Sequence, residues 1–127
     1  MKKLVAALVA VLVTASVFAA EFPDISIKEV KALTKSKQAV IIDVNGSESY
    51  QKGHVPGALN FEAIQDKLAS ALPADKHALI VAYCGNPKCL AYKEAAEAAA
   101  KLGYTNVKHM SAGIMGWKDA GEKMEKK

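Results

Sequence analysis

His77-Ala-Leu-Ile-Val-Ala-Tyr83, followed directly by Cys84-Gly-Asn-Pro-Lys-Cys89, is the most informative stretch of this chain. The first part has the length and apolar composition of a buried strand. The second part is short and carries glycine, asparagine and proline, which predicts a tight loop. An alanine-rich run from Leu90 to Leu102 then predicts a helix, which Gly103 closes. The stretch therefore predicts a strand, a loop and a helix, with Cys84 at the end of the strand.

Cys84 is a candidate nucleophile because of this setting. A loop between a strand and a helix directs backbone N–H groups and the positive end of the helix dipole towards one sulfur. Such surroundings stabilise the thiolate, which is the reactive form of cysteine. The alternative for a single cysteine at the end of a strand is a small, buried apolar side chain. Cys84 and its immediate neighbours leave both interpretations open.

The rest of the chain alternates strands and helices with short connections. Strands are expected at residues 22–25, 39–44, 59–61, 77–83 and 106–110, and helices at 26–33, 47–52, 62–72, 90–102 and 114–118. This order predicts one α/β domain with an open parallel β-sheet flanked by helices on both faces. Ligand sites of such sheets lie at the carboxyl ends of the strands, which is where Cys84 falls.

The first 20 residues have the pattern of a secretory signal peptide. Lys2 and Lys3 precede an uncharged apolar run from Leu4 to Phe18, and Ala19 and Ala20 follow it. We expect a signal peptide at 1–19 and a mature domain at 20–127 that is periplasmic or secreted. Once cleaved, it is expected to have no stable association with a membrane. The alternative is an uncleaved anchor, for which the apolar run is short.

The charged residues and the two cysteines restrict the possible functions further. All the basic residues are lysines, and they are interleaved with acidic residues, which argues against a nucleic-acid partner. Cys84 and Cys89 enclose only four residues. A disulfide that closes so short a loop removes little entropy from the unfolded chain, so a reactive or redox role is favoured over a structural one. Four zinc ligands at a usual spacing are missing, and we expect no metal and no cofactor.

Several short motifs in the chain resemble one family when they are taken together and in order. They are Ile42-Asp-Val44, Gly53-His-Val-Pro-Gly-Ala58, Tyr83-Cys-Gly85, Gly103-Tyr-Thr-Asn-Val107, Gly113 and Trp117. Their order and spacing are similar to those of single-domain rhodanese proteins. The resemblance implies a rhodanese-type sulfurtransferase, in which the cysteine takes sulfane sulfur from a donor, holds it as a persulfide and gives it to a thiophilic acceptor.

The resemblance also implies which residues form the site. The persulfide residue would be Cys84, by its position in the motif. The substrate would be held by the backbone N–H groups of the loop, contributed by Gly85, Asn86, Lys88, Cys89 and Leu90. Pro87 adds none, because proline has no N–H.

The chain departs from the family's pattern at two positions, which affects the expected donor. Asn45 and Lys88 stand where many members carry arginine. An arginine would bind the thiosulfate dianion in a bidentate way that a lysine cannot. Polysulfide or a persulfidated thiol is therefore at least as plausible a donor as thiosulfate. Cysteine phosphatases share the fold but need an arginine at the end of the loop, where this chain has Leu90, so phosphatase activity is disfavoured.

Four other residues have candidate roles. Asp43 either orders the loops of the site, as the resemblance implies, or caps the following turn, and in both cases supports structure. His54 is expected to hold its turn by hydrogen bonds rather than to transfer protons. Lys88 either attracts anionic substrates or is an idle surface lysine. Cys89 is a candidate resolving thiol, which would attack an oxidised or persulfidated Cys84.

Two hypotheses about function remain open. The first is an exported sulfurtransferase that uses Cys84, acting as a monomer on a small sulfur-donor anion or a persulfidated protein. The second is a rhodanese-fold binding or thiol-redox module in which Cys84 and Cys89 cycle between dithiol and disulfide without transferring sulfur.

Overall fold

A four-stranded parallel sheet forms the centre of the molecule. The computed structural model describes residues 21–127, so the expected signal peptide at 1–19 lies outside the described residues. The strands are β1 (Ala39–Asp43), β2 (Leu59–Asn60), β3 (Leu79–Tyr83) and β4 (Val107–His109). Their order in the sheet is β2-β1-β3-β4, and every pair is parallel. The two central strands are the β-branched and apolar runs, because both of their faces are buried.

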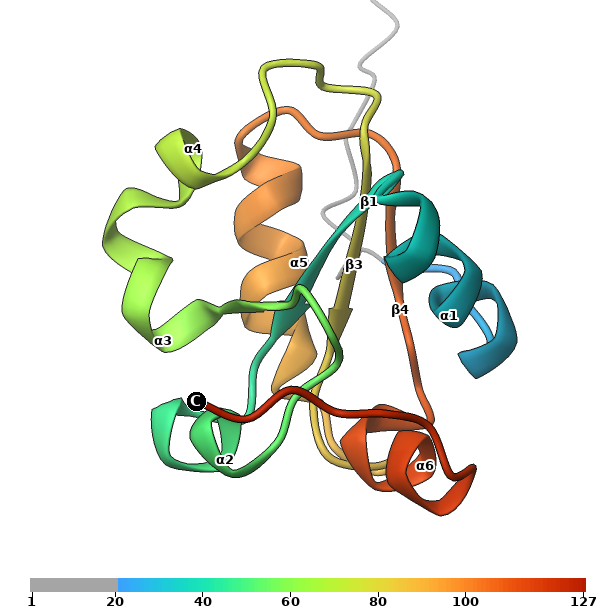
Figure 1. Ribbon diagram of the computed structural model, residues 1–127. Coiled ribbons are helices and arrows are strands. Elements are labelled where there is room, and N and C mark those ends of the chain that lie inside the picture. Colours follow the sequence, from blue (N-terminus) through green and yellow to red (C-terminus); the bar gives the residue numbers. More distant parts are fainter. Residues whose placement is uncertain (1–20) are drawn as a thin grey trace, which may run out of the picture.

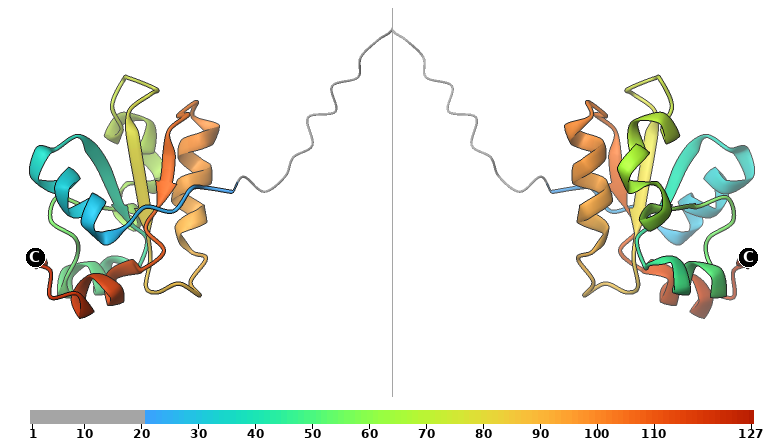
Figure 2. Two further views of the ribbon diagram at one scale, coloured as in Figure 1. Left: turned by 90° about the vertical axis from the view of Figure 1, so that its right-hand side faces the viewer. Right: turned by 90° about the vertical axis from the view of Figure 1, so that its left-hand side faces the viewer.

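Helices cover both faces of this sheet, as Figures 1 and 2 show. One face carries α3 (Phe61–Ile64), α4 (Leu68–Ala71) and α5 (Tyr92–Lys101), and the other carries α1 (Ile27–Ser36) and α6 (Gly113–Asp119). Side chains alternate along β3, so Ile80 and Ala82 pack against the α5 side and Val81 and Tyr83 against the α1 and α6 side. The expected fold class, an open parallel sheet flanked by helices on both faces, is confirmed.

Local sequence explains two of the helices. Ser26 caps α1, because its Oγ accepts a hydrogen bond from the Glu29 N–H at 3.1 Å. In α5 the residues that face the sheet are Ala95, Ala96 and Ala99, and all three are fully buried. Small side chains on this face let the helix approach the strands closely. The short helix α2 (Ser47–Lys52) follows β1 and has the expected bounds.

The structure corrects several of the expected elements. Residues 62–72 do not form one helix, because a short 3₁₀ turn, η1 (Gln65–Lys67), separates α3 from α4 and the backbone leaves helical values at Lys67. Residues 22–25 contribute a single bridge between Asp24 and His109 rather than a strand, and Pro23 lacks the N–H that a longer ladder needs. Helix α1 continues to Ser36, three residues farther than expected.

Within residues 21–127, no helix is long and apolar enough to cross a membrane.

Candidate active site

Cys84 lies directly after β3, at the carboxyl edge of the sheet, and only 3% of it is exposed. Two backbone hydrogen bonds attach this point of the chain to the first turn of α6. The N–H of Ile114 donates to the carbonyl of Cys84 at 2.9 Å, and the N–H of Met115 donates to the carbonyl of Gly85 at 3.0 Å. Both carbonyls therefore point towards α6. These two bonds fix the direction in which the loop continues from the end of β3.

Gly113 is the residue against which the loop packs. Its φ is +65°, a conformation that residues with a side chain rarely adopt. A Cβ at this position would stand 2.4 Å from the carbonyl carbon of Gly85 and 2.7 Å from the nitrogen of Asn86, which are backbone atoms and cannot move aside cheaply. Only glycine therefore lets the Gly85–Asn86 peptide lie on the start of α6.

Asn86 shapes the loop from within. Its Oδ1 accepts a hydrogen bond from the Lys88 N–H at 2.9 Å, and its carbonyl accepts one from the Cys89 N–H at 3.0 Å. This turn brings Cys89 back to the end of β3, where it forms a disulfide with Cys84 across a Cα–Cα distance of 6.3 Å. Hydrogen bonds from α6 and hydrogen bonds to Asn86 thus both fix the conformation of the loop.

This arrangement modifies the expected cradle of N–H groups. In the disulfide-bonded state Lys88 and Cys89 donate within the loop, so their N–H groups are not free for a substrate. The N–H groups of Gly85, Asn86 and Leu90 have no hydrogen-bond partner among the residues that the structure describes. The expectation that the helix begins at Leu90 is also wrong, because α5 begins at Tyr92 and leaves Leu90 in the loop.

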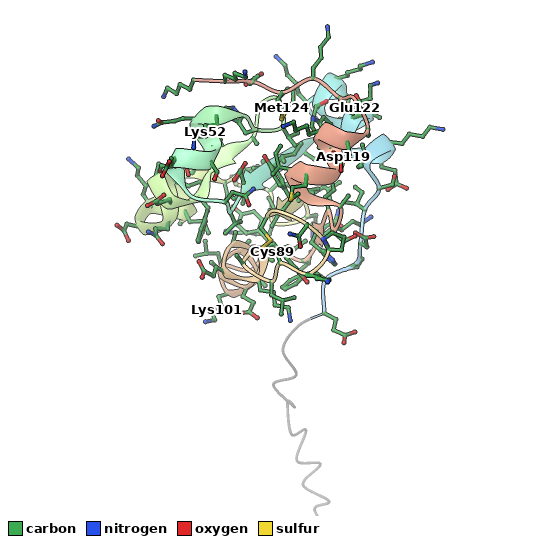
Figure 3. The ribbon with its side chains drawn as sticks, turned by 90° about the horizontal axis from the view of Figure 1, so that it is seen from below. Lys52, Cys89, Lys101, Asp119, Glu122 and Met124 are labelled. Atoms are coloured by element: carbon green, nitrogen blue, oxygen red, sulfur yellow. A yellow bond between two sulfur atoms is a disulfide. The ribbon has the colours of Figure 1, made fainter. Side chains whose placement is uncertain are left out.

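Two large apolar side chains and one lysine are exposed beside the disulfide. Figure 3 views the molecule from this side and labels Cys89 among the side chains of the loop. Leu90 on the loop is 60% exposed and Met115 on α6 is 56% exposed. Lys88 is also exposed. Cys89 is half-buried whereas Cys84 is buried, so Cys89 is the more accessible of the two.

Asp43 ends β1 beside the end of β3 and is fully buried. Its Oδ1 accepts a hydrogen bond from the Asn45 N–H at 2.8 Å, which caps the following turn, and its Oδ2 accepts one from the Tyr83 hydroxyl at 2.6 Å. Burial raises the pKa of the Asp43 carboxyl, and these two hydrogen bonds oppose the rise. Burial and the neighbouring Asp43 likewise raise the pKa of Tyr83.

His54 holds the turn before β2. The ring stacks on that of Tyr50 with a centroid distance of 3.6 Å, and its Nδ1 lies 2.7 Å from the Tyr50 carbonyl. Its backbone N–H and carbonyl form a bridge with Glu125, with hydrogen bonds of 2.9 and 2.8 Å. The Nε2 is 3.5 Å from the Glu125 carboxylate. These contacts are with the turn and the carboxyl-terminal segment, and Figure 1 shows that segment passing close to α2.

Two polar residues contribute to this edge in ways that sequence reasoning missed. The Tyr83 hydroxyl also accepts the N–H of Val55 at 3.0 Å, so it joins Asp43 to the turn that holds His54. Asn45, expected only as a replacement for arginine, has a buried Nδ2 without a hydrogen-bond partner among the described residues. The sequence did contain one sign of the Tyr83 contacts. A tyrosine in a buried strand needs a hydrogen-bond partner for its hydroxyl group.

Other parts of the described chain carry no comparable cluster. Residues 21–127 contain no group of three His, Cys, Asp or Glu side chains placed to hold a metal ion. A cavity of about 420 Å³ between α1 and α6 is lined by Lys31, Trp117 and Lys123 among others, and none of the expected site residues borders it.

One family model and several known proteins match this chain. The family model described as Rhodanese-like domain matches residues 26–120. The HTH-type transcriptional regulator Rv0324 of Mycobacterium tuberculosis is 36% identical over 86 residues, which are 66% of this chain and 36% of the regulator, so the chain spans about a third of that relative's length. The thiosulfate sulfurtransferase GlpE of Shewanella oneidensis is 26% identical over 101 residues, covering 78% of this chain and 95% of that enzyme.

Solved structures agree on the fold. The rhodanese-like domain of the Anabaena protein Alr3790 superposes with a TM-score of 0.67 at 22% sequence identity, over 84% of this chain and 81% of that one. At this sequence identity, the similarity shows that the fold is shared and nothing more.

Proposed function

Because the chain belongs to the rhodanese-like domain family, we propose that it is a sulfurtransferase that carries sulfane sulfur on Cys84. The observation that carries the proposal is the position of Cys84, at the carboxyl end of a central strand in a loop whose first two carbonyls accept hydrogen bonds from α6. With the carbonyls of Cys84 and Gly85 directed away, free backbone N–H groups remain to stabilise a thiolate or a persulfide anion.

In the proposed reaction the Cys84 thiolate attacks the sulfane sulfur of the donor. The bond between the two donor sulfurs breaks, and the donor leaves with its electron pair. Cys84 then carries a persulfide, whose outer sulfur passes to a nucleophilic acceptor such as a thiolate or cyanide. The acceptor step returns Cys84 to the thiolate, so the transfer needs no cofactor.

Polysulfide and persulfidated thiols are the donors that this loop fits best. The chain has no arginine, and Lys88 is a flexible point charge in place of a planar clamp for the sulfonate end of thiosulfate. The exposed Leu90 and Met115 offer apolar area around the loop on which a persulfidated protein could rest. We propose that the protein acts as a monomer in the periplasm or outside the cell, as the signal-peptide pattern suggests.

A thiol-redox module is the second candidate, and the pairing of Cys84 with Cys89 is the observation in its favour. In that case both cysteines would only exchange electrons with a partner, and no sulfur would move. The two candidates predict different masses for Cys89→Ser after exposure to a sulfane donor, since only a sulfurtransferase gains sulfur on Cys84 and keeps it when the second thiol is removed.

Turnover to cyanide tests the proposal. Thiocyanate formation is measured with polysulfide and with thiosulfate for the reduced parent protein, Cys84→Ala and the matched variant Cys89→Ser. We expect Cys84→Ala to lose turnover while its circular dichroism is unchanged, and Cys89→Ser to retain it. We also expect polysulfide to be the better donor. Turnover near the parent level in folded Cys84→Ala would place the chemistry elsewhere.

Export is tested separately. Protein recovered from a fractionated host should lack residues 1–19 and should be found outside the cytoplasm. Recovery of chains that begin at Met1 in the cytosol would contradict the export proposal without touching the chemistry of Cys84.

A further inference from the structure

We infer that the protein also reduces sulfane sulfur to hydrosulfide, using Cys89 as an internal acceptor of the Cys84 persulfide. This inference rests on the proposed function, because the persulfide on Cys84 is its starting point. The disulfide between the two cysteines is the product that such a step leaves behind. It adds a second fate for the loaded sulfur, in addition to transfer to an external acceptor.

The loop already has the shape that the step requires. The Cα atoms of Cys84 and Cys89 are 6.3 Å apart, within the usual range for a disulfide. Asn86 maintains this separation through hydrogen bonds to the N–H groups of Lys88 and Cys89, and α6 fixes the other end through Ile114 and Met115. The bond therefore forms with the strand and both flanking helices in place.

The bonds and electrons balance without an additional oxidant. The Cys89 thiolate attacks the inner sulfur of the persulfide, which is Sγ of Cys84. The new bond joins the two cysteine sulfurs, and the bond between Sγ and the outer sulfur breaks. The outer sulfur takes the proton that the Cys89 thiol gives up on becoming the thiolate, and it leaves as hydrosulfide with the electron pair of the broken bond. It is reduced, and the two cysteines together lose two electrons.

An external dithiol completes the cycle by reducing the disulfide. Cys89 is half-buried whereas Cys84 is 3% exposed, so a dithiol reaches the sulfur of Cys89 first. Attack there expels Cys84 as the thiolate, which is the form that accepts the next sulfur. The second thiol of the reductant then releases Cys89. The net reaction converts one sulfane sulfur and one dithiol into hydrosulfide and a disulfide.

Proximity favours the internal step over transfer to a dilute acceptor. Only four residues separate Cys84 from Cys89, and the described loop holds them at bonding distance. Such positioning converts a bimolecular reaction into a unimolecular one. External acceptors should therefore compete for the sulfur only at high concentration or when bound at the loop.

A single-turnover experiment tests the inference. Reduced and desalted parent protein, Cys89→Ser and Cys84→Ser are mixed without oxygen or reductant with one equivalent of inorganic tetrasulfide. Intact mass and hydrosulfide are followed over time. Because the donor can itself release hydrosulfide, the amount formed with Cys89→Ser is subtracted. Circular dichroism and the variant Cys89→Ala show whether the loss of the thiol, rather than a change of fold, is responsible.

The expected masses differ between the variants. The parent should end about 2 Da below its reduced mass, as a disulfide, and release about one hydrosulfide per chain above the control. Cys89→Ser and Cys89→Ala should instead keep a gain of about 32 Da, one sulfur atom, and Cys84→Ser should release no excess hydrosulfide. A parent that keeps its added sulfur as long as Cys89→Ser would overturn the inference and leave the proposed function standing. If Cys89→Ser never gains sulfur, the proposed function fails as well.

Discussion

The two central strands end side by side, with Asp43 paired to Tyr83 just before Cys84, yet the two ends are built differently. At the end of β1 the Asp43 carboxyl group is buried, and its two oxygens accept hydrogen bonds from Asn45 and Tyr83. After β3, Cys84 enters a loop held by backbone hydrogen bonds, and the side chains around the loop are exposed. One strand end holds a buried polar group in hydrogen bonds, and the other holds the sulfur that we propose to react. A shared edge of a sheet therefore does not give its residues a shared role.

Gly113→Ala should have the largest effect, because it acts on the strand end that carries Cys84. The new Cβ would collide with the backbone of Gly85 and Asn86. We expect a loss of about 2–4 kcal/mol in unfolding free energy from overpacking and the left-handed backbone. We also expect a fall of about tenfold or more in the rate of sulfur loading, since a displaced loop loses most of its hydrogen-bond stabilisation of the sulfur.

Gly121→Ala is the matched control for that variant. Gly121 has a φ of +74° but open space where its Cβ would stand, so the substitution adds backbone strain without a collision. It should cost about 1–2 kcal/mol and leave sulfur loading unchanged. Denaturant unfolding and stopped-flow loading measure both effects. Equal loading rates for the two variants would show that the packing of the loop on α6 does not matter for the site.

Tyr83→Phe tests the hydrogen bonds of Asp43 at the end of β1. The variant removes the hydroxyl that donates to Asp43 and accepts from Val55, so two buried polar groups lose their partner. We expect a loss of about 1–3 kcal/mol in unfolding free energy with sulfur loading on Cys84 retained.

Tyr92→Phe is the control here, because the Tyr92 hydroxyl has no hydrogen-bond partner among the described residues while its ring stacks on His109. It should change the unfolding free energy by less than about 0.5 kcal/mol. If Tyr83→Phe abolished loading at unchanged stability, the division of roles between the two strand ends would be wrong.

The pH dependence of stability should report on Asp43. Its pKa is raised in the folded protein, so the folded state holds the proton to a higher pH than the unfolded chain does. The contribution of Asp43 to the free energy of unfolding is therefore fully present below the pKa of the unfolded chain. It is lost as the pH rises through the pKa of the folded protein. Asp43→Asn cannot ionise and lacks this decline.

Urea unfolding of the parent and of Asp43→Asn between about pH 3 and 7 measures this effect, which we expect to be smaller than that of Tyr83→Phe. The advantage of the parent over the variant should be greatest at acid pH and should shrink towards neutrality. An advantage that grew with pH would mean that hydrogen bonds from Tyr83 and Asn45 outweigh burial and that the pKa of Asp43 is lowered.

Lys88→Gln should have the smallest effect. Lys88 is exposed on the loop, so its attraction for an anionic donor is screened by solvent and salt. We expect a decrease of about 2–5-fold in kcat/KM for thiosulfate at low ionic strength, which disappears at high salt. Lys101→Gln, at the far end of α5, should have no effect. Identical behaviour of the two variants would make Lys88 an idle surface lysine.

The sequence was sufficient for the central strands and for the position of Cys84. β1 and β3 are continuous apolar runs, and their bounds differ from the expected ones by one and two residues. The order of strand, loop and helix is enough to place Cys84 at the carboxyl edge of the sheet. These features depend on local composition and on the rules that govern parallel sheets, which a single sequence contains.

The contacts between distant segments could not be predicted in this way. The pairing of Asp43 with Tyr83 depends on the register between β1 and β3, which are 40 residues apart. The hydrogen bonds from Ile114 and Met115 to the loop depend on where α6 packs. The break at Lys67 arises although Phe61, Ile64 and Leu68 have helical spacing, so that spacing alone did not show it. Each of these features is set by the assembled core rather than by its own segment.

The shortness of the Cys84–Cys89 loop has a consequence for the time course of folding in an oxidising compartment. A loop this short closes in well under a microsecond even in an unfolded chain, long before the β1–β3 ladder can form. The chain has only two cysteines, so no incorrect intramolecular pairing exists for an isomerase to correct. Oxidation can therefore come before or after folding and still give the same bond.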